Sequence, residues 1–245
     1  MGMKTNKCCC GTSVPPSLFV GISQSASVIL IRQYDMLGNV LTPTFWTLNT
    51  GIVASQPIDI ACHPSGRVHI VTGDSKKLYT LDETGSVLWS KTDADTLLAV
   101  AVDSNMNVYT GGFNATVNKY DASGNHITSG GWPYVPAGPP YLSIRGISVD
   151  QLGNVYVCGL RVGGAAGSNL IKLSPAGTLL WQVYLGDGAD SPANAGSACG
   201  DLSINAANTH LVVAKRGSAT QTTAFIVNAS TGSFTSARKN DNLAA

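Results

Sequence analysis

The stretch GISVDQLGNVYVCG (residues 146–159) places two short apolar runs, at 147–149 and 155–157, on either side of a polar turn at 150–154. This pattern indicates a β-hairpin, because Asp bonds back to its own turn and Gly adopts the positive φ that a tight turn needs. Three other stretches keep the same register: IACHPSGRVHIVTG (60–73), VAVDSNMNVYTGG (100–112) and LSINAANTHLVVA (202–214). The hairpin is therefore one copy of an internal repeat.

A second hairpin pattern alternates with the first. It occurs as QYDMLGNVL (33–41), TLDETGSVLW (80–89), KYDASGNHIT (119–128), KLSPAGTLLW (172–181) and IVNASTGSFT (226–235), with turn glycines 47, 39, 53 and 55 residues apart. Two hairpins make four strands per period, and a period near 40–50 residues is typical of propeller blades. The sequence contains no sustained apolar period of 3.6 residues, which is the pattern that would indicate a helix. The sequence therefore predicts an all-β fold, a β-propeller of five blades with four antiparallel strands each.

The repeats also predict the domain boundaries. Residues 1–17 form a cysteine-bearing N-terminal segment, residues 18–238 form a single propeller domain, and residues 239–245 form a C-terminal tail. The run LFVG (18–21) matches the second strand of the other blades, so the innermost strand of the first blade is expected near residues 8–14. The N-terminal segment would then supply a strand to that blade.

Charge and hydropathy narrow the classes of partner. The 245 residues carry a net charge of +1, and only 12% of them are charged, so the sequence gives no electrostatic reason to expect nucleic acid or an anionic membrane as partner. No apolar run approaches the length of a membrane helix. The two lysines near the N-terminus are not followed by the apolar stretch of a secretion signal. Other proteins or glycans are the expected partners.

The six cysteines fall into two groups. Three stand alone in apolar or small-residue surroundings, which predicts buried packing roles without a regular disulfide framework: Cys62, Cys158 and Cys199. The other three form the run Cys8, Cys9 and Cys10. Successive side chains of an extended chain point to opposite sides, so a metal or thiol cluster there needs a bend and outside ligands. Simple packing of the segment is the alternative.

The repeats resemble those of known propeller families. The second pattern, especially LDETGSVLWSK (81–91) and LSPAGTLLWQV (173–183), resembles the pyrroloquinoline-quinone-type propeller repeat. The first, in VDQLGNVYVCG (149–159) and VDSNMNVYTGG (102–112), is similar to the short repeats of bacterial surface propellers. The resemblance implies architecture and no catalytic residue, because these folds serve many functions.

Aromatic residues provide the candidate contact site. Trp46, Trp89 and Trp181 fall on expected fourth strands, where a repeated large aromatic predicts packing between blades. The stretch SGGWPYVPAGPPY (129–141) is a Gly- and Pro-rich connection, and long connections of this kind are commonly functional. Its aromatic residues are the predicted partner or ligand contacts: Trp132, Tyr134 and Tyr141.

The remaining motifs predict no catalytic residues, no cofactor and, outside the cysteine run, no metal site. The Asp residues occupy repeat turns, the histidines lack a His-x-x-x-His spacing, and no Gly-x-Ser-x-Gly elbow occurs. The first hypothesis is a non-enzymatic binding or assembly module within a larger assembly, most specifically a bacteriophage virion protein for head or tail decoration or host attachment. A surface or secreted lectin-like propeller, which binds carbohydrate or protein outside the cell, is the alternative. A quinone-dependent or hydrolytic enzyme comes third.

Overall fold

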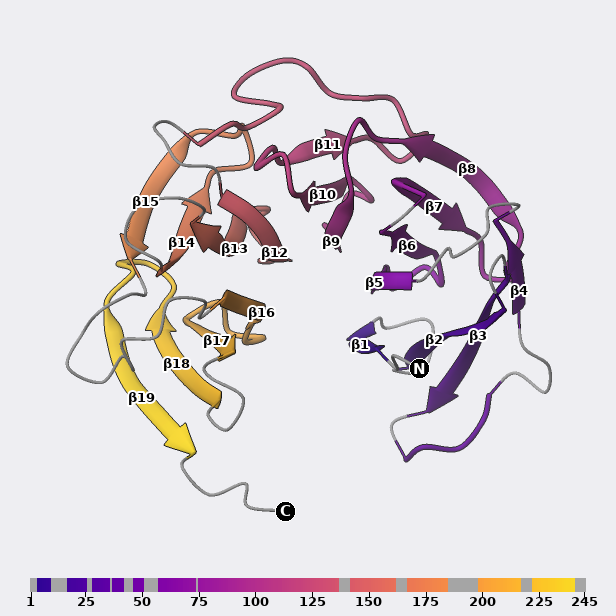
Figure 1. The fold of residues 1–245 in the computed structure, drawn as a ribbon, viewed down its shortest axis with the longest axis horizontal. Coiled ribbons are helices and arrows are strands. Elements are labelled where there is room, and N and C mark those ends of the chain that lie inside the picture. Colours follow the sequence, from indigo (N-terminus) through magenta and orange to yellow (C-terminus); the bar gives the residue numbers. More distant parts are fainter. Residues whose placement is uncertain are drawn as a thin grey trace. The chain divides into compact units, whose positions relative to one another are not determined.

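The computed structural model describes residues 4–9, 17–25, 28–35, 37–41, 46–50, 57–73, 75–136, 142–161, 167–184, 198–216 and 222–240. Within these ranges every regular element is a β-strand, which confirms the predicted all-β class. The strands form five sheets, each from a continuous stretch of chain (Figure 1). Four sheets have four strands and one has three.

Neighbouring strands of each sheet are consecutive in the chain. The first sheet contains β1 (Lys4–Cys9), β2 (Ser17–Ser25), β3 (Val28–Asp35) and β4 (Trp46–Asn49). The second contains β5 (Pro57–Cys62), β6 (Val68–Thr72), β7 (Lys77–Leu81) and β8 (Val87–Thr92), and the third β9 (Leu97–Val102), β10 (Val108–Gly112) and β11 (Asn118–Tyr120). The fourth contains β12 (Leu142–Val149), β13 (Val155–Arg161), β14 (Gly167–Leu173) and β15 (Leu179–Tyr184), and the fifth β16 (Ala198–Ile204), β17 (His210–Arg216), β18 (Thr222–Asn228) and β19 (Phe234–Asn240).

The first strand lies earlier in the chain than the sequence predicts. Strand β1 ends at Cys9 and pairs antiparallel with β2, with Lys4 opposite Gly21 and Cys9 opposite Ser17. The expected position near residues 8–14 is therefore wrong. The strand lies about half a strand length earlier in the chain, because its pairing with β2 sets its register. The N-terminal cysteine-bearing segment supplies this strand to the first sheet.

The third sheet lacks a regular fourth strand among the described residues. Isolated bridges between Tyr120 and His126 and between Val117 and Tyr134 take its place. The intervening chain contains Gly130, Gly131 and Pro133. Proline has no N–H for a ladder and glycine weakens a strand, so this segment follows the edge of the sheet without forming a continuous ladder.

The chain divides into two compact units, Met1–Thr110 with Lys119–His126, and Gly111–Asn118 with Ile127–Ala245. Apolar side chains fill the space between successive sheets within each unit. In the first unit, Ile29 and Ile31 of β3 pack with Ile60 and Val68 of the second sheet. In the second unit, Leu170 of β14 belongs to one buried cluster with residues of the fifth sheet. The bounds of a single domain at residues 18–238 remain a prediction.

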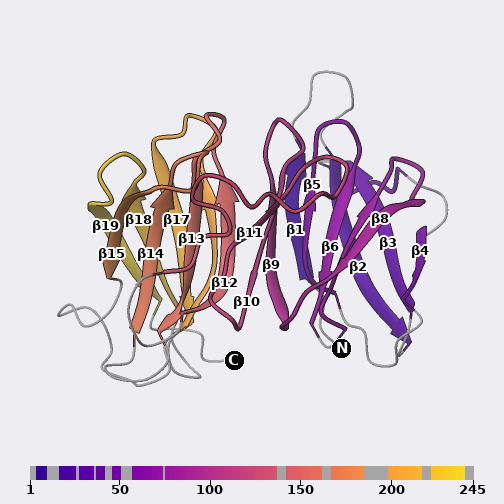
Figure 2. The same ribbon diagram turned by 90° about the horizontal axis from the view of Figure 1, so that it is seen from above.

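In the second, fourth and fifth sheets, tight turns join the first strand to the second and the third to the fourth. In an antiparallel meander these two connections lie at the same end of the sheet, as the turns at 150–154 and 174–178 do (Figure 2). Their backbone closes with an N–H to C=O bond from the fourth residue to the first, 3.0 Å from Gly153 to Asp150. The second and third strands join at the opposite end, where the loop of residues 113–117 lies.

Candidate functional site

The repeated Asp residues are turn formers, as predicted. One oxygen of Asp150 accepts the backbone N–H groups of Leu152 (2.9 Å) and Asn154 (2.8 Å). The other oxygen accepts the Asn154 side-chain amide at 2.8 Å. Gly153, next to the end of the turn, has a φ of +81°, a value that side chains other than glycine rarely adopt. Asp35, Asp103 and Asp121 make the same set of bonds. These carboxylates stabilise the turns of the sheets and are not available to a ligand.

Tryptophans of the outer edge pack against the turn of the next sheet. The Trp89 indole N–H donates to the carbonyl of Ala122 at 3.2 Å, and that of Trp181 donates to the carbonyl of Ala229 at 3.3 Å. A side chain at turn residue Gly124 would lie 2.8 Å from the Trp89 ring. Indole and glycine therefore fit together, which confirms the predicted packing role between sheets.

Trp132 is a further member of this set, so the expected ligand contact at Trp132 is not what the structure shows. Its side chain is only 4% exposed, and its indole N–H donates to the carbonyl of Pro175 at 3.0 Å. Pro175 belongs to the turn that follows β14, just as Ala122 and Ala229 belong to turns of their sheets. A buried indole with a satisfied donor packs against the turn that follows β14 and offers no face to a ligand.

The other predicted contact residues differ in what the structure describes. Tyr134 is half-buried, its backbone N–H and C=O pair with those of Val117 at 3.0 and 2.9 Å, and burial raises the pKa of its phenol. Tyr141 and Cys10 lie outside the described residues. Cys8 and Cys9 belong to β1, and only their backbone is described. The cysteine cluster therefore stays a prediction.

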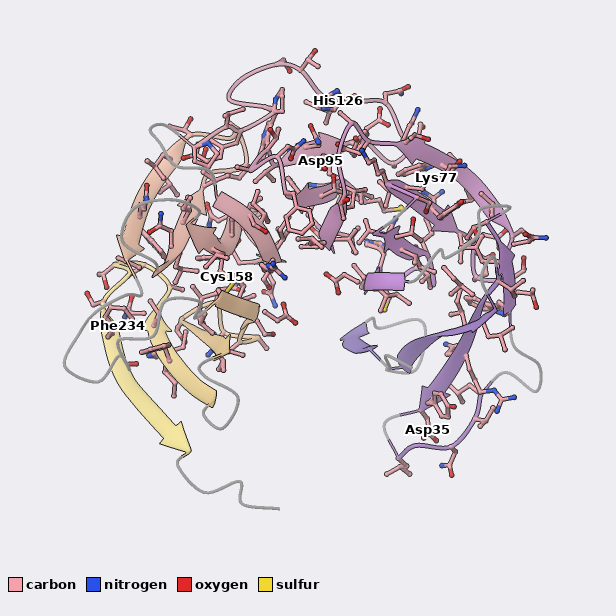
Figure 3. All side chains as sticks on the ribbon, in the orientation of Figure 1. Asp35, Lys77, Asp95, His126, Cys158 and Phe234 are labelled. Atoms are coloured by element: carbon pink, nitrogen blue, oxygen red, sulfur yellow. A yellow bond between two sulfur atoms is a disulfide. The ribbon has the colours of Figure 1, made fainter. Side chains whose placement is uncertain are left out.

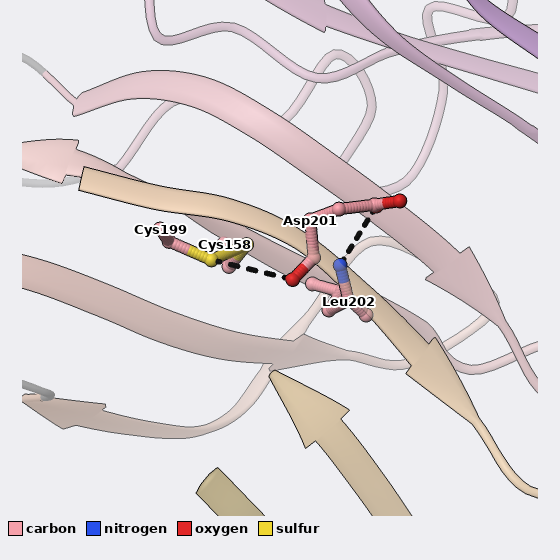
Figure 4. Close-up of a disulfide and its surroundings, with 4 residues drawn as sticks. All are labelled: Cys158, Cys199, Asp201 and Leu202. Atoms are coloured by element: carbon pink, nitrogen blue, oxygen red, sulfur yellow. Dashed lines mark hydrogen bonds between the residues drawn. A yellow bond between two sulfur atoms is a disulfide. The ribbon is translucent and has the colours of Figure 1, made fainter. Parts of the chain in front are cut away.

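Two cysteines expected to act as separate packing residues form a disulfide instead. Cys158 on β13 and Cys199 on β16 are joined with a Cα–Cα distance of 6.0 Å (Figures 3 and 4). Both are fully buried, as predicted. The bridge was missed because the two residues are 41 positions apart and meet only when two successive sheets pack. Cys62 is half-buried beside the cluster of the first two sheets.

A buried Asp and a buried Tyr with an adjacent Lys recur in the third and fourth sheets. The Tyr156 hydroxyl donates to Asp150 at 3.0 Å, and the Lys172 ammonium lies 5.2 Å from the Tyr156 ring centroid. Asp103, Tyr109 and Lys119 repeat this arrangement with the same two distances.

Burial explains how these groups ionise. It raises the pKa of both phenols, with a further contribution from the adjacent Asp in each case. Burial also lowers the pKa of both lysines, while the same Asp residues act in the opposite direction. Perturbed groups often mark functional sites, but here the arrangement recurs at equivalent repeat positions, which favours a structural role.

In the second sheet, His63 and His69 stand where the other two sheets have Asp and Tyr. His69 Nδ1 lies 2.8 Å from the Thr80 hydroxyl, and its side chain is 1% exposed. Burial, with smaller contributions from His63 and Arg67, lowers the pKa of His69 to about 3. The native imidazole is therefore neutral throughout the range in which an exposed histidine gains a proton.

This histidine predicts a loss of stability in acid. The unfolded chain binds a proton below about pH 6.5 and the folded chain does not, so the stabilisation is complete above that pH. It falls as pH decreases from 6.5 toward 3, by roughly 3 kcal/mol at about pH 4.5. Urea unfolding of the wild type and of His69→Phe between these pH values would measure the difference in slope. Equal slopes for the two proteins would contradict the prediction.

Two exposed apolar side chains and one arginine at the loop end of the second unit are called here the Phe113 surface. It comprises Phe113, 48% exposed, Val135, 61% exposed, and the half-buried Arg145. Val135 follows Tyr134, which pairs with Val117, and the loop that begins at Phe113 leads into Val117. The Arg145 guanidinium carbon lies 5.6 Å from the Phe113 ring centroid. Side chains of this kind are available to a partner.

Sequence reasoning missed this surface, although a signal was present. Phe113 follows Gly111 and Gly112, and the equivalent loops of the second, fourth and fifth sheets carry no aromatic residue. An aromatic that no repeat requires is a candidate for contact with a partner. Within the described ranges, no group of three or more His, Cys, Asp or Glu side chains is placed to bind a metal ion. The described chain also has no helix with the length and hydropathy of a membrane span.

Comparison with known proteins agrees with the architecture. A family model described as a beta-propeller repeat matches residues 137–160, which include β12, its turn and most of β13. No curated protein matches the sequence. The resemblance to propeller repeats is thus supported over one hairpin of the chain.

Solved structures of the same fold extend the similarity to nearly the whole chain. A protein of unknown function from Bacteroides caccae superposes with a TM-score of 0.58 at 14% identity, covering 93% of this chain and 74% of that one. BamB from Moraxella catarrhalis superposes with a TM-score of 0.59 at 14% identity, covering 97% of this chain and 66% of that one. The chain thus spans just under two thirds of BamB. At this identity the likeness establishes the β-propeller fold.

Proposed function

We propose that this chain is a non-enzymatic binding or assembly module that makes its contacts through the Phe113 surface. The observation that carries the proposal is how the repeated side chains are used. Asp150 and Trp132 each bond within the scaffold, whereas Phe113 and Val135 expose apolar area that no repeat requires. Propellers commonly present binding groups on loops held by a rigid set of sheets.

The disulfide supports a setting outside a reducing cytoplasm. Bridges such as Cys158–Cys199 form and persist in oxidising surroundings, including cell surfaces and virions. The specific setting that we propose is a bacteriophage particle, with the chain as a head or tail decoration or a host-attachment protein. The low charge of the chain and its loops rich in Gly, Thr and Asn favour this setting.

Mass spectrometry of bacteriophage particles purified on a density gradient tests the proposal. We expect peptides of this chain to follow the particle peak in constant ratio to the major structural protein. A double variant, Phe113→Ser with Val135→Ser, should lower that ratio at least fivefold. Leu88→Ser, at a residue of β8 that is 45% exposed, is the matched control and should leave it unchanged. Particles that lack the chain altogether would refute the virion setting.

A surface or secreted lectin-like propeller is the second candidate. The observation that favours it is the contact between the Arg145 guanidinium and the exposed ring of Phe113. A cation over one face of a half-exposed aromatic ring is suited to binding sugars or acidic groups. Retention of the chain on immobilised glycans, with none in particles, would favour this candidate over the first.

A further inference from the structure

We infer that Arg145 and Phe113 form a binding site for an acidic sugar, whose carboxylate Arg145 binds and whose C–H face stacks on Phe113. The inference rests on the proposed binding function and names a ligand class for it. It starts from an irregularity in β12. The register between β12 and β13 shifts between Ile144 and Gly146, which makes Arg145 the extra residue of a β-bulge. Bulges are frequent beside functional sites, where they re-aim one side chain.

Arg145 departs from the repeat at this position. The first strands of the second and fifth sheets have a similar register shift, between Pro57 and Asp59 and between Cys199 and Asp201. The extra residues there are Ile58 and Gly200, neither of which is charged. Among these three single-residue shifts, only the one in β12 introduces a charged side chain, and the architecture that the three sheets share does not explain it.

The guanidinium has unused capacity to donate. Arg145 Nε is buried and has no hydrogen-bond partner among the described residues. On the same strand, the hydroxyl of Ser143 is buried and likewise lacks a described partner. Buried donors are nearly always satisfied in native proteins. The unpaired Arg145 Nε, on a guanidinium that also lies over the exposed Phe113 ring, therefore points to a ligand that accepts hydrogen bonds.

The nearby carboxylate of Asp201 does not take this role. It lies against Gly146, and its Oδ1 accepts the Leu202 N–H at 2.7 Å (Figure 4). No ion pair joins Arg145 to an acidic side chain in the described part of the chain. A planar guanidinium prefers a carboxylate in paired, two-bond geometry, so an incoming carboxylate would supply the missing acceptors.

Phe113 decides which carboxylate fits. Its ring is 48% exposed, and the Arg145 guanidinium carbon lies 5.6 Å from the ring centroid. Ile144 packs against Gly111, which places the two segments side by side. A bare anion would use the cation and leave the ring in water, whereas a uronic or nonulosonic acid unit presents a carboxylate next to an apolar C–H face. The pair of side chains matches both parts of such a unit.

Titration of the full chain with sodium glucuronate and with N-acetylneuraminate, followed by NMR, tests the inference. We expect millimolar or tighter binding of one of these, and at least tenfold weaker binding of glucose and of acetate. Arg145→Met should abolish binding, and Phe113→Ala should weaken it about fivefold or more. Lys91→Gln, which removes one positive charge on β8, is the control and should bind like the wild type.

Other outcomes would overturn the inference in identifiable ways. Glucose binding as tightly as glucuronate would remove the role of the carboxylate. If acetate bound as tightly as the acidic sugars, the site would be a simple anion site with no preference for a sugar. Unchanged binding by an Arg145→Met chain with a wild-type unfolding midpoint would exclude Arg145. If no acidic sugar binds while the chain still joins particles through the Phe113 surface, only this inference fails and the assembly function stands.

Discussion

Replacing Trp132 by alanine is expected to lower the free energy of unfolding by about 3–5 kcal/mol. The indole is buried to 96%, and it packs against the turn that contains Pro175. Alanine would leave a cavity between two turns and an acceptor without its donor. Urea unfolding monitored by circular dichroism measures the loss.

Trp132→Phe is the informative control. It keeps most of the ring but removes the N–H that donates to Pro175, so a smaller loss of about 1–3 kcal/mol is expected. The same pair of substitutions at the partly buried Trp181, which donates to Ala229, should give smaller losses in the same order. An alanine variant at residue 132 with unchanged stability but lost binding would mark Trp132 as a contact residue after all.

Removing the Cys158–Cys199 bridge is expected to cost about 4 kcal/mol, because the bridge closes a loop of roughly 40 residues and so restricts the unfolded chain. The double variant Cys158→Ala, Cys199→Ala should show this loss in urea unfolding. The wild type in a strong thiol reductant should approach the same stability. The double variant should not respond to the reductant, which separates this bridge from the effects of the other cysteines.

A thiol count gives an independent check on the bridge. The chain has six cysteines, so the denatured, unreduced wild type should react at no more than four thiols, since two belong to the bridge. Reaction at all six, together with equal stability of the wild type and the double variant, would show that the bridge does not form.

The turns and sheets were predictable because they follow from local chemistry. Each Asp-x-x-Gly-Asn stretch fixes a tight turn through bonds among neighbouring residues, as at Asp150 and Asn154. Even Met106, which replaces glycine, occupies the expected position with a φ of 63°. The repeat thus determines the fold class without any information about distant contacts.

The role of Trp132 was less predictable, although its spacing contained the information. Trp89 follows Trp46 by 43 residues, and Trp132 follows Trp89 by 43. Gly and Pro residues around Trp132 obscure its register, so the composition suggested a loop. The 43-residue spacing, in contrast, placed Trp132 at the outer edge of a sheet, like Trp46 and Trp89. Spacing was the better guide, since packing between sheets depends on position along the repeat.

The disulfide and the Arg145 site could not be obtained from the sequence by local reasoning. Cys158 and Cys199 occupy different repeats and meet only through packing of β13 with β16. Arg145 is placed by a bulge whose presence depends on pairing with β13. Both features require knowledge of which strands are neighbours, and that follows from tertiary structure.

The β-propeller fold supports a binding or scaffold module. In this chain, one class of side chain holds the sheets together and another is exposed for contact with a partner. Residues such as Trp181 and Asp150 bond within the sheets. Phe113 and Val135 remain exposed at the loop end. Changes at the first class should alter stability, and changes at the second should alter partner binding with little effect on unfolding.

Because each sheet is one continuous stretch of sequence, its strands can pair as soon as that stretch has left the ribosome. Local pairing closes short loops and is fast compared with synthesis at roughly 5–20 residues per second. The sheets would then form in the order of translation. Cys158 would then belong to a paired sheet before β16, which contains Cys199, is synthesised. The disulfide could therefore form only late in folding, after the fifth sheet has been made.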